Sequence, residues 1–119
     1  MDDKKLNAVA ELLTEGWRLN RFTKNLTRFA DEKIQRKIDN QVARFDKKFF
    51  RAAAELGLEV VDFTGAEFET GLPVEPINLA DFAAEENLFV EAMLEPTIKP
   101  TNSAEIIKLG VAVLGRRKT

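Results

Sequence analysis

Carboxylates are the main side chains left to do chemistry in this chain, because three of the usual reactive residue types are absent. The 119 residues include no histidine, no cysteine and no tyrosine. A Ser-His-Asp arrangement around Ser103 is therefore impossible, and the commonest general base is missing. A zinc site would have to be built from carboxylates alone, which is unusual. We therefore expect no enzyme, no catalytic residue, no metal site and no cofactor.

The charged residues divide the chain into a basic part and an acidic part. Residues 17–52 include eleven Lys/Arg and four Asp/Glu, whereas residues 53–98 include eleven Asp/Glu and no Lys/Arg. The basic part could follow a phosphate backbone. We do not expect nucleic acid as the main partner, because the acidic part would repel it and the cations are spread around the expected helix. The cations concerned are Arg18, Arg21, Lys24, Arg28, Arg36, Arg44, Lys47, Lys48 and Arg51.

Residues 17–56 carry the strongest structural pattern in the chain. Apolar residues recur every three or four positions and no proline interrupts them, which predicts one long helix. Forty helical residues span about 60 Å, whereas a ~120-residue globule has a radius of gyration of about 14 Å. The steps between Leu26 and Val42 are all four residues, a stutter in a coiled-coil repeat. Gly16 would be either a bend before this helix or a weak point within it.

Such a helix has to cover its apolar stripe, and we expect a second copy of the chain to do so. A homodimer through paired helices would use the residues along the stripe. The alternative is a long helix folded back on the chain's own C-terminal half. The expected dimerisation residues are Leu19, Phe22, Leu26, Ala30, Ile34, Ile38, Val42, Phe45 and Phe49.

The period of the pattern changes after Leu56, where Gly57 is a helix-ending signal. Three segments are rich in branched and aromatic residues and predict strands, namely 58–63, 88–95 and 106–114. Within the second segment, residues 91–94 (EAML) would also suit a helix. Two prolines confine 72–79 to an edge strand or an extended segment, and 98–104 is expected to be a loop. The predicted fold class is α+β, with a long dimerising helical arm over residues 1–56 and a small, mainly antiparallel β-domain over residues 57–119.

The sequence also predicts where the protein resides. No apolar run approaches the ~18 residues of a membrane span. The N-terminus lacks the apolar core of a signal peptide, and the absence of cysteine suits a reducing compartment. We expect a cytoplasmic protein without a membrane partner.

The order of a long helix and a small sheet resembles the GrpE family, the nucleotide exchange factors of Hsp70 chaperones. Segment 56–61 (LGLEVV) is similar to the phenylalanine-glycine-valine-glutamate opening of the family's β-domain. Segment 67–74 falls where the family has a proline-leucine-aspartate-proline turn and an extended segment. Segment 91–97 (EAMLEPT) is similar to the strand that ends in glutamine-lysine-glycine-tyrosine, and segment 106–113 (IIKLGVAV) to the final strand of the family.

Three positions depart from the family's pattern. Pro96-Thr97 stands where the family has glycine-tyrosine, Asn102-Ser103-Ala104 stands where it has asparagine-glycine-arginine, and Lys108 replaces the arginine of the last strand. The chain thus resembles a shortened, divergent relative.

The resemblance implies a homodimeric co-chaperone without a cofactor. Its β-domain would enter the nucleotide-binding domain of an Hsp70-like ATPase and promote ADP release. An interface needs apolar anchors with charge around them. A non-catalytic coiled-coil subunit of a larger assembly is the alternative function. The expected partner-binding residues are Phe68, Leu72, Met93, Glu95 and Lys108.

Overall fold

The computed structural model describes residues 1–117, which form two compact units. The first unit runs from Met1 to Glu59 and is helical, and the second begins at Val60 and is built from strands. The predicted α+β class is confirmed. The division falls slightly after the boundary at residues 56 and 57 that the sequence suggested.

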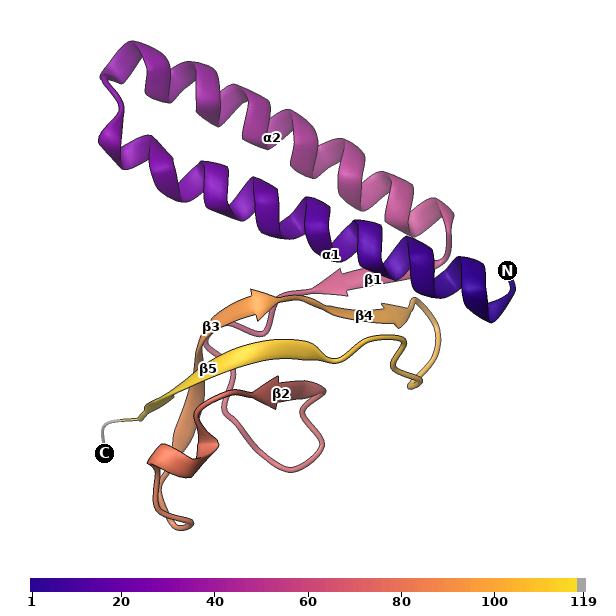
Figure 1. Cartoon of the computed structure of the whole chain (residues 1–119), viewed down its shortest axis with the longest axis vertical. Helices are drawn as coiled ribbons and strands as arrows, with labels where there is room; N and C mark the ends of the chain where they lie inside the picture. The colour runs from indigo at the N-terminus through magenta and orange to yellow at the C-terminus, as the bar shows by residue number, and fades with distance from the viewer. Residues whose placement is uncertain (118–119) are drawn as a thin grey trace. The chain divides into compact units, whose positions relative to one another are not determined.

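The first unit is a helical hairpin. Helix α1 (Asp3–Leu26) is followed by the short 3₁₀ helix η1 (Thr27–Phe29) and by helix α2 (Glu32–Glu55). The two long helices lie side by side and run in opposite directions (Figure 1). The Asn20 amide of α1 donates a hydrogen bond of 2.8 Å to the Asp46 carboxylate of α2, which ties their facing sides together.

The prediction of one continuous helix over residues 17–56 is therefore wrong. The chain leaves the helical conformation at Ala30, whose backbone is extended, and Asp31 caps the new helix by accepting a hydrogen bond from the Ile34 amide at 2.9 Å. Aspartate is a favoured residue at this position. The four-residue steps of the apolar pattern continue across the break, so periodicity alone did not locate it.

Gly16 does not bend the chain, because it lies inside α1. A β-carbon at this position would lie 3.2 Å from the Phe49 ring and 3.3 Å from the Phe45 ring, both on α2. The glycine therefore allows two aromatic rings to approach the backbone of α1. The predicted helix end at Leu56 and Gly57 is confirmed, since Leu56 caps α2 and Gly57 follows with a φ of 75°.

The strands form a three-stranded and a two-stranded sheet. Strand β5 (Gly110–Arg116) lies between β3 (Leu88–Glu95), which is antiparallel to it, and β2 (Val74–Pro76), which is parallel to it. Strand β1 (Leu58–Val61) pairs with β4 (Thr97–Pro100). The short 3₁₀ helix η2, between β2 and β3, spans Leu79–Asp81. The arrangement is thus mixed, and the proline-containing β2 occupies an edge as predicted.

Two predicted boundaries in this unit are wrong. Residues 98–100 of the segment expected to be a loop, 98–104, belong to β4, which pairs with β1. Ile98 is fully buried and also exchanges backbone hydrogen bonds with Lys108. The last strand begins at Gly110 rather than at Ile106. Composition did not predict β4, because one proline precedes the strand and another lies within it.

The core of the second unit lies on one side of the three-stranded sheet and continues under β4. Buried residues alternate along β5, as expected for a strand with one covered face. The register places Val90 opposite Leu114 and Met93 opposite Ala112. The fully or almost fully buried side chains of this unit are Val74, Leu88, Val90, Met93, Pro96, Thr97, Ile98, Ala112 and Leu114.

Candidate functional site

An exposed apolar row on α1 is the most prominent candidate interaction surface of the first unit. The row consists of Leu12, Leu19, Phe22 and Leu26, whose steps of seven, three and four residues are those of a coiled-coil seam. Leu19 is 68% exposed and Phe22 is 61% exposed. Glu15 occupies the remaining seam position and pairs with Arg18 at 2.9 Å. We call these four apolar residues the α1 row.

The expected dimerisation residues are divided between the two helices. Leu19, Phe22 and Leu26 belong to the α1 row, whereas Ile34 and Phe45 are exposed on α2. The others are less available, because Val42 is buried and the remaining three are half-buried, namely Ala30, Ile38 and Phe49.

Burial of Val42 corrects its assignment to a dimer interface. It lies four residues before Asp46 and seven before Phe49, both of which contact α1. Residues with this spacing share one helix face. Val42 therefore belongs to the side of α2 that closes the hairpin.

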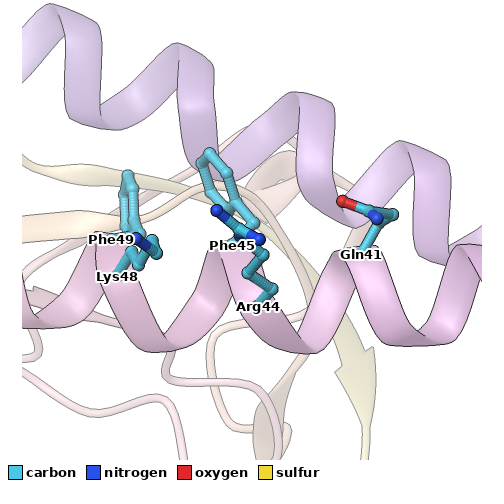
Figure 2. A pocket seen from close by; sticks show the side chains of 5 residues that line it. All are labelled: Gln41, Arg44, Phe45, Lys48 and Phe49. Atoms are coloured by element: carbon cyan, nitrogen blue, oxygen red, sulfur yellow. The ribbon is translucent and has the colours of Figure 1, made fainter.

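A shallow pocket opens on the side of α2 next to Phe45. Its lining comes from α2 alone and combines the Phe45 and Phe49 rings with the cationic side chains of Arg44 and Lys48 (Figure 2). The two rings are stacked, with centroids 5.1 Å apart. A second pocket beside it is lined by Arg44, Lys47, Lys48 and Arg51.

In the second unit, the structure brings together three of the five predicted partner-binding residues. The Lys108 ammonium group lies 2.8 Å from the Glu95 carboxylate. Leu72 lies near this ion pair, because the next residue, Pro73, accepts hydrogen bonds from the Thr97 hydroxyl and the Gly110 amide. This end of the sheet therefore offers two paired charges beside a half-buried leucine.

The other two predicted residues do not extend this group. Met93 is only 5% exposed, and its methyl group packs against Gly110, so it supports the surface from below and is not an exposed anchor. Phe68 is half-buried, and its amide donates to the Leu88 carbonyl at the opposite end of β3 from Glu95. Seven residues of strand separate those ends, which is about 23 Å.

Sequence reasoning missed two exposed apolar residues at this end of the sheet. Leu94 is 45% exposed and precedes Glu95, and Leu109 is 46% exposed and follows Lys108. The exposure of Leu94 could not be read from a pattern because it follows directly on other apolar residues, and Leu109 has no alternating neighbours, since it stands between Lys108 and Gly110. We define the β3–β5 patch as Leu72, Leu94, Glu95, Lys108 and Leu109.

Within residues 1–117, no three acidic side chains gather closely enough to hold a metal ion. In that same range, no helix is both long enough and apolar enough to cross a membrane.

Comparison with known proteins identifies no relative of this chain. No family model matches the chain, and neither a curated protein nor a solved structure matches it. The resemblance to the GrpE family therefore rests on the sequence segments described above and stays a prediction.

Proposed function

We propose that this protein is a homodimeric, GrpE-like adaptor that binds the nucleotide-binding domain of an Hsp70-like ATPase and promotes release of ADP. The observation that carries the proposal is the α1 row. Four large apolar side chains with coiled-coil spacing lie exposed on one helix, which is the pattern of a seam that a second helix covers.

The β3–β5 patch supports the second half of the proposal. Exposed leucines flank a pair of opposite charges there, and interfaces combine apolar anchors with a charged rim. All five residues of the patch lie in the segments resembling the GrpE β-domain, namely 67–74, 91–97 and 106–113. Binding through it requires no bond chemistry, in keeping with the residue types that this chain contains.

The experiment that tests the proposal is the rate of release of a fluorescent ADP analogue from the nucleotide-binding domain of an Hsp70-like ATPase. The native chain should accelerate release. A charge-reversed variant, Glu95→Lys with Lys108→Glu, preserves the internal ion pair but inverts the charges that a partner would meet. It should keep the fold, judged by circular dichroism, and lose the acceleration.

A matched control uses another ion pair of the same unit. Arg116 lies 3.0 Å from Glu86, away from the patch, so the variant Glu86→Arg with Arg116→Glu should accelerate release as the native chain does. The proposal is wrong if the native chain leaves the release rate of ADP unchanged. The assignment of the patch is wrong if both charge-reversed variants behave alike.

A further inference from the structure

The cations of α2 are not spread around the helix but form a ridge on the side that faces away from α1. Arg44 and Lys48 each lie two residues from Asp46, which contacts α1, and two residues correspond to about 200° around a helix. Lys47 and Arg51 lie three and seven residues after Arg44, so they share this side. This ridge corrects the sequence-based argument that the cations follow no common line.

The ridge is free to bind anions. All four side chains are exposed, and among residues 1–117 no carboxylate forms an ion pair with any of them. They line one continuous hollow. Two more cations, Lys33 and Lys37, lie eleven and seven residues before Arg44. Helical spacing therefore places them on the same side of α2. From Lys33 to Arg51 the ridge is about 27 Å long.

An aromatic ring borders the ridge. Arg44 and Lys48 line both the cationic hollow and the pocket that contains Phe45 and Phe49 (Figure 2). The tip of the Phe45 ring approaches Gly16 of α1 and one face stacks on Phe49, yet Phe45 keeps 38% of its surface exposed. A phosphate chain could therefore run along the cations while one base stacks on this ring, which is how proteins bind single strands without reading their sequence.

We propose that this side of α2 is a binding surface for single-stranded nucleic acid. The ligand favoured by these residues has regularly spaced negative charges and unpaired aromatic rings. A duplex supplies the charges but keeps its bases stacked inside, and an acidic peptide supplies no bases. The proposal is independent of the adaptor function, because it uses neither the α1 row nor the β3–β5 patch.

The experiment is fluorescence anisotropy of a labelled oligothymidylate titrated with the full chain. If four phosphates are neutralised, affinity should fall about 50-fold between about 50 mM and about 200 mM salt. The variant Arg44→Gln with Lys48→Gln should reduce that loss to about 7-fold, since two contacts remain. Binding at the lower salt concentration should lie near the micromolar range.

Two further variants separate the ridge from general charge effects. Lys4→Gln with Lys5→Gln removes the same charge from exposed positions at the start of α1 and should leave affinity within about twofold of the native value. Phe45→Leu retains an apolar side chain but no ring, and should weaken binding about tenfold, within the range of one base–aromatic stack.

Several results would overturn the proposal. They are absence of binding at the lower salt concentration, equal losses for the ridge variant and the Lys4/Lys5 control, and an unchanged affinity for Phe45→Leu. Equal affinity for a duplex or for polyglutamate would also overturn it, since either would show that the surface selects charge alone.

Discussion

Thr97 holds together three strands of the second unit, and removal of its hydroxyl group should loosen the whole unit. The side chain is completely buried. Its hydroxyl donates to the Pro73 carbonyl at 2.7 Å, just before β2, and accepts from the Gly110 amide at 3.1 Å, at the start of β5. Valine has nearly the same shape as threonine, so Thr97→Val removes both hydrogen bonds without opening a cavity.

The expected loss follows from those two bonds. Each intramolecular hydrogen bond contributes about 0.5–1.5 kcal/mol net, and a buried group left unpaired costs more. The Gly110 amide and the Pro73 carbonyl keep one long bond of 3.4 Å to each other, which limits that cost. We expect the free energy of unfolding of the second unit to fall by about 2 kcal/mol.

Amide hydrogen exchange is the appropriate assay, because the only tryptophan, Trp17, lies in the first unit. A loss of about 2 kcal/mol should speed exchange of the protected amides of β3 and β5 about 30-fold. The control Thr101→Val, at an exposed position after β4, should change exchange by less than about threefold. If Thr97→Val also changes the exchange rate by less than about threefold, the two hydrogen bonds do not hold the sheet together.

Three further predictions concern stability. Gly110→Ala should destabilise the second unit by about 1–3 kcal/mol, because the new methyl group would lie 2.5 Å from the Met93 methyl and 2.6 Å from the Thr97 hydroxyl; normal exchange in β5 would contradict this. Asp31→Ala should cost about 1 kcal/mol in thermal unfolding followed by tryptophan fluorescence, because it removes the cap of α2. In a continuous helix the same change would be stabilising, so a gain would refute the hairpin. Leu114→Ala should cost about 2–5 kcal/mol, since the side chain is 2% exposed, whereas the control Leu79→Ala, at an exposed site, should cost less than about 1 kcal/mol in the same exchange assay.

The helical character of the first half could be predicted from the sequence, but its turn could not. Apolar residues every three or four positions define helix wherever they occur. The turn depends on Asp31 and on the extended backbone at Ala30. An aspartate in a helical pattern is equally compatible with an exposed face, so only the position of α1 across from α2 distinguishes a cap from an interior residue.

The sheet was predictable where branched and aromatic residues are frequent, as at the start of β3. It was also predictable at the edge, where prolines excluded a central position for β2. β4 was missed because a strand of four residues that follows one proline and ends on another has too short a pattern to recognise. The ion pair between Glu95 and Lys108 could not be derived from spacing, since it depends on how β3 is aligned with the residues before β5.

The candidate surfaces were predicted only in part, because an apolar pattern does not show which of its residues the rest of the chain will bury. The spacing of the apolar residues in a stripe does not indicate which of them a second helix of the same chain will cover. Val42 and Leu19 belong to the same sequence pattern, yet the hairpin buries the first and leaves the second exposed. Similarly, Met93 and Leu94 are neighbours in one apolar run, but Met93 is buried in the core and Leu94 is exposed, because successive side chains of a strand point to opposite faces.

The central claim is that the α1 row is covered by a second copy of the chain, and light scattering during size-exclusion chromatography tests it most directly. The native chain should elute with a mass of about twice the 13.4 kDa of one chain. The variant Leu19→Glu with Phe22→Glu should elute near the mass of one chain, with an unchanged helical circular-dichroism signal. A native mass of one chain at every concentration examined, or an unchanged dimer in the variant, would contradict the claim.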